Sequence, residues 1–161
     1  MFKSVEWRAE GALRLIDQRK LPAETLYIDY TSAQAVAQAI YEMVVRGAPA
    51  IGDTAAYGIA LEAFHYAGDA AGLRNRLAAA DRVLRASRPT AVNLFYALDR
   101  MAIVANDLSL TTATAIRTAL LTEAHAIAQE DADTCRQIGR NGAALVPQTA
   151  NIVHHCNTGG L

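Results

Sequence analysis

Short apolar runs separated by turn residues mark the first thirty residues of the chain. The runs are broken at Glu10-Gly11 and again before Pro22, and they cover residues 2–7, 12–16 and 26–30. Short runs rich in β-branched and aromatic residues, bounded by glycine or proline, are typical of strands joined by tight turns. Residues 1–30 are therefore predicted to form a small β-sheet or meander.

From Thr31 onwards the hydrophobic period becomes that of a helix. Apolar side chains recur every three or four residues, which places them on one helical face. The first helix is predicted over 31–45, with Thr31 or Ser32 as its N-cap. Glycine, proline and short polar stretches then divide the chain into four further predicted helices, over 49–66, 70–86, 90–106 and 112–144. In the last of these, Ile138 continues the apolar period of Ile116 and Leu120.

The pattern changes once more after Pro147. Residues Asn151–His154 are predicted to form a strand, and Asn157–Gly160 the turn at its carboxyl end. A lone strand cannot complete its ladder of hydrogen bonds by itself. The sequence therefore resembles the front part of a longer protein.

Composition and charge exclude several classes of partner. The 161 residues include 15 basic and 16 acidic side chains, and this balance gives no reason to expect nucleic acid or a membrane surface. Only two cysteines are present, Cys135 and Cys156, which fits reduced thiols better than a disulfide scaffold. Residues Met1–Arg8 lack the unbroken apolar run of a signal peptide. A soluble cytoplasmic protein is expected.

The segment Arg46–Gly52 is the strongest candidate for an anion site. It places an arginine and a glycine directly before a predicted helix, where exposed backbone N–H groups carry partial positive charge. The same residues could simply end one helix and begin the next, and the sequence alone leaves both interpretations open. Arg88, which precedes another predicted helix, is a second candidate phosphate ligand or else a solvated loop arginine.

Cys156 is the one candidate for thiol chemistry. It follows the predicted strand, where ligands gather in open α/β sheets, and a helix starting after Gly160 would lower the thiol pKa. The alternative is a small buried cysteine. His154 shares its strand face, but two ligands do not make a zinc site, so no metal is predicted. Four acids have no diagnostic spacing and receive no catalytic role: Asp53, Glu62, Asp99 and Glu123.

Taken together, four separated motifs resemble the methylthioribose-1-phosphate isomerase family of methionine salvage. The resemblance covers essentially the whole chain, and the motifs occur in the family's order. They are the opening segment with Leu13, Leu15, Ile16, Asp17, Gln18 and Leu21-Pro22, the signature Met43–Gly58, the stretch Arg88–Leu94, and His155–Gly159.

The resemblance implies an activity and a set of site residues. Members of the family interconvert an aldose 1-phosphate and its ketose 1-phosphate, moving hydrogen between C1 and C2 without a redox cofactor. Arg46, Gly47, Ala48 and Arg88 match substrate-binding positions, and Cys156 matches the cysteine thought to assist the transfer or stabilise its transition state.

The resemblance also implies a second, Rossmann-like domain that carries the general acid/base aspartate and other substrate contacts. The expected fold is mainly α: a β element over 1–30, a helical domain over 31–146, and at 147–161 the first strand of that truncated α/β domain. A homodimer, formed chiefly through the second domain, is expected of the complete protein. The 161 residues alone are expected to be inactive, because half of the site is missing.

Two other functions remain open at this point. One is a regulatory or assembly protein like the related subunits of the translation initiation exchange factor, which share the two-domain plan. The other is a relative of ribose-1,5-bisphosphate isomerase, which would need extra cations for the C5 phosphate in a region beyond Leu161.

Overall fold

A three-stranded antiparallel sheet opens the chain. The computed structural model describes residues 3–155 and 161, and its sheet has the strand order β1-β2-β3. Leu13 of the central strand is paired with Trp7 on one side and with Tyr30 on the other. The strands are β1 (Val5–Arg8), β2 (Ala12–Ile16) and β3 (Tyr27–Tyr30), so the predicted meander is confirmed.

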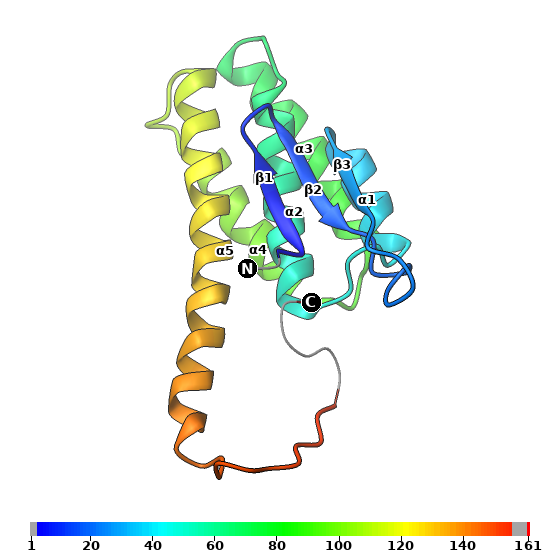
Figure 1. Ribbon diagram of the computed structural model, residues 1–161. Helices are drawn as coiled ribbons and strands as arrows, with labels where there is room; N and C mark the ends of the chain where they lie inside the picture. Colours follow the sequence, from blue (N-terminus) through cyan, green and yellow to red (C-terminus); the bar gives the residue numbers. More distant parts are fainter. Residues whose placement is uncertain (1–2, 156–160) are drawn as a thin grey trace.

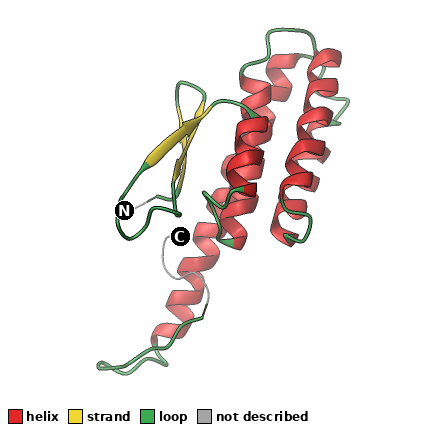
Figure 2. Cartoon of the chain, turned by 90° about the vertical axis from the view of Figure 1, so that its right-hand side faces the viewer, coloured by secondary structure: helices red, strands yellow, loops and turns green. Residues whose placement is uncertain are grey.

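Five helices follow the sheet, and the second of them forms the centre of the molecule. They are α1 (Ala33–Tyr41), α2 (Ala48–Phe64), α3 (Ala70–Ser87), α4 (Val92–Ala105) and α5 (Ala113–Ala143). Residues 51–63 of α2 are all buried, since the other four helices and two strands pack around it. The sheet lies against one side of the helices (Figure 2). The prediction of a mainly helical fold with an N-terminal β element is confirmed.

Helix α1 ends four residues earlier than its apolar period predicts. At its carboxyl end the Met43 N–H donates to the Ile40 carbonyl at 3.2 Å, and the Val44 N–H donates to the Ala39 carbonyl at 2.9 Å. This is a Schellman motif, and Met43 takes the left-handed conformation that it requires, with φ of 62°. The turn sends Val44 and Val45 into the core, so their hydrophobicity reflects burial beyond the helix.

Helix α5 continues well past the bundle. Its first half buries Ile116, Leu120, Ala124 and Ile127, whereas its second half is mostly exposed and projects away from the other helices (Figure 1). Ile138 therefore keeps the helical period without joining the core. No helix in the described part of the chain is both long and apolar enough to span a membrane.

The predicted strand over Asn151–His154 is wrong. Residues 151–155 are irregular and exposed, and the side chain of Val153 is 100% accessible. A strand needs a neighbour to receive its hydrogen bonds, and the described residues place none beside this segment. The predicted first strand of a Rossmann-like domain is thus not seen in the described residues; the predicted turn at 157–160 lies outside them.

Candidate functional site

The N-terminus of α2 carries backbone donors that have no hydrogen-bond partner among the described residues, and it lies beside an arginine. Gly47 is the N-cap residue, and no side chain caps the helix. The N–H groups of Ala48 and Ala50, in the first turn, have no intrahelical acceptor, whereas Ile51 N–H already donates to Gly47 O at 2.8 Å. Arg46 is exposed and has no hydrogen bond or ion pair with any described residue. This arrangement suits an anion.

A second open N-terminus lies at α4. Its N-cap is Ala91, which has no side-chain oxygen, and Arg88 lies three residues earlier at the end of α3. Arg88 is half-buried and, like Arg46, makes no ion pair within the described part of the chain. A Cβ atom built on Gly52 would lie only 2.8 Å from the Asn93 carbonyl oxygen. The first turns of α2 and α4 are therefore in close contact.

The carboxyl end of the described chain returns to the same place. A Cβ atom built on Gly47 would lie 2.4 Å from the carbonyl oxygen of Leu161. Figure 1 shows the C-terminus at the end of the bundle where α2 begins. Leu161 thus lies beside Gly47, at the predicted anion site. Cys156 itself lies outside the described residues, and its role stays a prediction.

The remaining helices begin differently. The N-cap side chains of α1, α3 and α5 each accept a hydrogen bond from the first turn, at 3.2, 2.7 and 3.1 Å. They are Ser32, Asp69 and Thr112. The two helices without a side-chain cap are those that follow the candidate arginines. The structure thus brings the Arg46–Gly52 and Arg88–Asn93 motifs together at one end of the bundle.

Asp53, one of the four acids given no catalytic role from the sequence, is a buried titratable group. Its side chain is 8% exposed, and no described residue forms a hydrogen bond with its carboxyl group. Burial and, as the smaller cause, the charge of Asp131 on α5 together raise the pKa of Asp53 to about 7. Only its place among the apolar neighbours of α2 could have suggested this from the sequence.

Tyr57 lies one turn after Asp53 on α2 and is a second buried polar residue of this helix. Its hydroxyl group lies 2.9 Å from Nδ1 of His125, and its ring stacks on Trp7 with centroids 5.8 Å apart. Burial, followed by the charge of Asp53, raises the pKa of Tyr57 to about 12. Tyr57 is therefore a neutral hydrogen-bonding group that joins α2 to α5.

The other acids considered from the sequence have structural partners. Glu62 accepts a hydrogen bond from the buried Ala33 N–H at 2.8 Å, so a side chain of α2 caps the start of α1. Glu62 accepts another hydrogen bond from Arg76 at 2.6 Å. Asp99 pairs with Arg85, and Glu123 pairs with Arg100. Within the described ranges, no three acidic, histidine or cysteine side chains are grouped so as to hold a metal ion.

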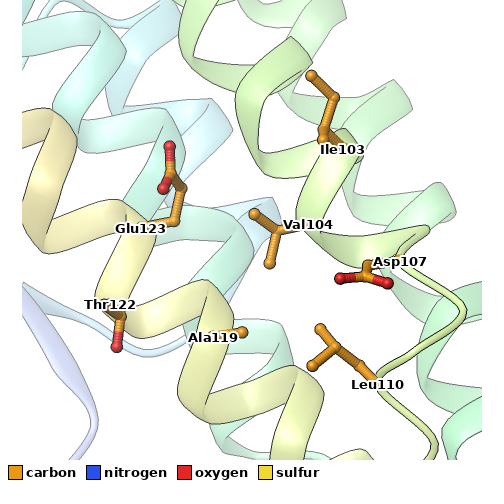
Figure 3. Close-up of a pocket in the computed structure, with 7 residues that line it drawn as sticks. All are labelled: Ile103, Val104, Asp107, Leu110, Ala119, Thr122 and Glu123. Atoms are coloured by element: carbon orange, nitrogen blue, oxygen red, sulfur yellow. The ribbon is translucent and has the colours of Figure 1, made fainter.

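An open groove of about 570 Å³ lies elsewhere, between α4 and the first half of α5 (Figure 3). It includes none of the motif residues and lies at the carboxyl end of α4, away from Arg88. Its two carboxylates are already bonded, since Glu123 pairs with Arg100 and Asp107 accepts from the Ser109 N–H. The lining residues are Ile103, Val104, Asp107, Leu110, Ala119, Thr122 and Glu123.

The curated proteins whose sequences are most similar to this chain include several isomerases of the same kind. The methylthioribose-1-phosphate isomerase of Synechococcus sp. is 53% identical over 163 residues, and that of Syntrophotalea carbinolica is 49% identical over the same length. Each alignment covers 99% of this chain and 46% of the relative. The chain therefore spans slightly less than half the length of these relatives.

Solved structures share the fold. The 5-methylthioribose 1-phosphate isomerase of Pyrococcus horikoshii matches with a TM-score of 0.87 and 35% identity, over 91% of this chain and 41% of that one. The delta subunit of translation initiation factor eIF-2B from A. fulgidus matches with a TM-score of 0.83 and 37% identity, over 91% and 42%. The model of the Initiation factor 2 subunit family matches residues 44–161, which include all four predicted substrate-binding residues and Cys156. This chain belongs to the Initiation factor 2 subunit family.

Proposed function

We propose that this chain is the N-terminal part of a methylthioribose-1-phosphate isomerase, which converts methylthioribose 1-phosphate to methylthioribulose 1-phosphate in methionine salvage. The observation that carries the proposal is the 53% identity to such an isomerase across 99% of the chain. The site geometry supports it, because a phosphorylated sugar needs an anion site and the open starts of α2 and α4 supply one.

In this proposal Arg46, Gly47, Ala48 and Arg88 bind the substrate. The two arginines supply positive charge, and the free N–H groups at the start of α2 donate to phosphate oxygens. Cys156 assists the movement of hydrogen between C2 and C1, or stabilises its transition state. No metal or cofactor is assigned to this half of the site.

The proposal includes a longer protein. Its second half would supply the general acid/base, close the pocket against water and form a homodimer in the cytoplasm. The exposed apolar side chains of Ile138, Leu145 and Ile152 support a further contact surface around the second half of α5. The 161-residue chain alone should show no turnover, and isomerisation by it would contradict this part of the proposal.

The test compares variants in the complete protein. Arg46→Ala should raise KM for methylthioribose 1-phosphate roughly 10- to 100-fold, the value of one or two charge-assisted hydrogen bonds. Cys156→Ser should lower kcat severely and leave KM nearly unchanged. The matched control is Arg82→Ala on α3, an exposed arginine that also makes no ion pair with the described residues.

Two results would contradict these roles. Equal KM values for Arg46→Ala and Arg82→Ala would remove Arg46 from the phosphate site, and unchanged turnover in Cys156→Ser would exclude a chemical role for the thiol. The same assay with ribose 1,5-bisphosphate distinguishes the related isomerase.

A regulatory or assembly subunit is the second candidate, favoured by the match to the eIF-2B delta subunit. It predicts a complete protein that turns over neither sugar phosphate although Cys156 and both arginines are intact.

A further inference from the structure

The turn that precedes Arg46 is held by residues of the loop that follows β2. We propose that Asp17 and Arg19, in the loop after β2, are positioning residues for Arg46 and Gly47: their ion-pair network fixes the turn between α1 and α2. The inference rests on the proposed function, in which Arg46 binds the phosphate.

The network starts from a buried carboxylate. Asp17 is 1% exposed and accepts three hydrogen bonds from Arg19: from its backbone N–H at 3.0 Å, from Nε at 2.8 Å and from Nη2 at 2.8 Å. Arg19 uses its remaining nitrogen, Nη1, to donate to Oε2 of Glu42 at 2.7 Å. Hydrogen bonding to Arg19 lowers the pKa of Asp17, so the carboxyl group is ionised at neutral pH. One arginine therefore joins the end of the sheet to the end of α1.

A backbone hydrogen bond attaches the same loop to the other side of the turn. The Gln18 N–H donates to the Val44 carbonyl at 3.0 Å. Glu42 precedes the left-handed residue Met43, and Val44 follows it. The loop is therefore hydrogen-bonded to the turn on both sides of Met43. Arg46 is the second residue after Val44. Its position is therefore set through the chain by these attachments, because its own side chain has no partner among the described residues.

The turn needs this support because its geometry is unfavourable for methionine. A non-glycine residue in the left-handed region costs about 1–2 kcal/mol, and it persists where surrounding contacts determine the conformation. The Arg19–Glu42 pair is partly exposed, so its direct effect on global stability should be small. Its main effect should be on the place of Arg46, since small displacements of a binding group weaken an oriented contact.

The test uses Arg19→Gln with Arg14→Gln as its matched control. Arg14 also makes two hydrogen bonds to an aspartate, at 2.7 and 2.7 Å to Asp29, and its side chain is about as exposed as that of Arg19. Asp29 is more exposed than Asp17, and the Arg14–Asp29 pair does not touch the turn. The measurements are amide hydrogen exchange at Val44, Val45 and Arg46, and a titration with inorganic phosphate followed through the NMR shifts of the Ala48 and Ala50 amides.

Arg19→Gln should raise exchange in the turn at least about tenfold and weaken phosphate binding roughly fivefold. Arg14→Gln should leave both quantities within about twofold of the parent chain. Arg19→Lys, which keeps the charge but not the fork of donors, should restore part of the phosphate affinity. A role in global stability alone would instead change exchange throughout the helices.

If Arg19→Gln fails to fold, Glu42→Gln replaces it. That change weakens the Arg19 link to the turn and alters the Gln38–Glu42 hydrogen bond of 2.7 Å within α1, but it leaves the Asp17–Arg19 pair intact. Equal effects of Arg19→Gln and Arg14→Gln, or unchanged exchange at 44–46, would overturn the inference. Absence of any phosphate-induced shift in the parent chain would count against the proposed function, while the exchange comparison would still decide whether Arg19 holds the turn.

Discussion

The five helices begin in two different ways. A side chain caps α1, α3 and α5, whereas α2 and α4 have no side-chain cap. Each helix begins with backbone N–H groups that its own turns cannot satisfy. In α1, α3 and α5, the N-cap side chains of Ser32, Asp69 and Thr112 each accept a hydrogen bond from one of these N–H groups. In α2 and α4, the N-cap residues Gly47 and Ala91 provide no such side-chain acceptor. A side-chain cap contributes about 1 kcal/mol, so the open starts give up local stability.

The difference shows how packing in the core can replace a side-chain cap. Helix α2 can do without a cap because residues 51–63 are buried on all sides, and core packing holds it in place. Helix α4 is held by its contact with Gly52 of α2. The open donors of both helices then lie at one end of the bundle, near two arginines that form no ion pair with any described residue.

Replacing Asp53 by Asn should have the largest effect. It would measure the stability that the fold loses by ionising a buried carboxyl group in α2. Asp53 is buried, and its pKa is raised from the ordinary 3.8 to about 7. Between pH 4 and 7 the folded state therefore binds more protons than the unfolded state, and stability falls as pH rises through this window. Asp53→Asn should remove that fall and gain roughly 2–4 kcal/mol at pH 8, with little change at pH 4.

Chemical denaturation of both proteins from pH 4 to 8 measures this difference. The facing groups are Tyr57 on α2 and Asp131 and Cys135 on α5, whose pKa values are also raised by burial. Asp131→Asn is the control. It should act in the same direction but less, because Asp131 is more exposed than Asp53. A parallel pH dependence in Asp53→Asn and the parent would refute the assignment.

Exchanging the two kinds of helix start should have an intermediate effect. Asp69→Ala removes the cap of α3 and should cost about 1 kcal/mol without altering phosphate affinity. Ala91→Asp adds a cap where the backbone is already extended, with φ of −85° and ψ of 96°. It should gain about 0.5–1 kcal/mol and weaken phosphate binding, because the new carboxylate competes for the same donors. Thermal unfolding and a phosphate titration of both variants separate the two types of start; unchanged affinity in Ala91→Asp would break the comparison at α4.

The smallest expected effect lies in the turn before α2. Met43→Gly should stabilise the fold by about 0.5–1 kcal/mol, since glycine adopts the left-handed conformation without a Cβ penalty. Met43→Ala keeps the penalty and removes most of the half-exposed side chain, so it isolates the backbone term. Denaturant midpoints measure both variants, and a Met43→Gly protein no more stable than Met43→Ala would show that the turn is unstrained.

Local sequence signals predicted most of the fold and one part of the site. The meander and the helices follow from hydrophobic period and punctuation. The same punctuation indicates the Arg46 and Arg88 motifs as candidates, and the fold brings Gly52 of the first close to Asn93 of the second. The end of α1 was missed because Met43 occupies a position where glycine is the usual signal.

Long-range contacts account for the remaining differences. The pattern at Asn151–His154 suits a strand, but a strand forms only against a neighbour. The raised pKa of Asp53 comes first from its burial among the packed helices and then from the charge of Asp131, which is far away in the sequence. The roles of Asp17 and Arg19 likewise appear only when the loop after β2 meets the end of α1.

The length of the projecting half of α5 determines the direction in which the chain leaves this helix. Because each residue turns a helix by about 100° and lengthens it by only about 1.5 Å, inserting one residue after Asp131 would swing the exit of the chain around the helix axis while hardly moving it along that axis. Seven inserted residues would return the exit to within about 20° of its original bearing, some 10 Å further out. Insertions and deletions in this half of α5 therefore keep the direction of the exit only in multiples of about two turns, and their size sets the direction in which the chain leaves the helix.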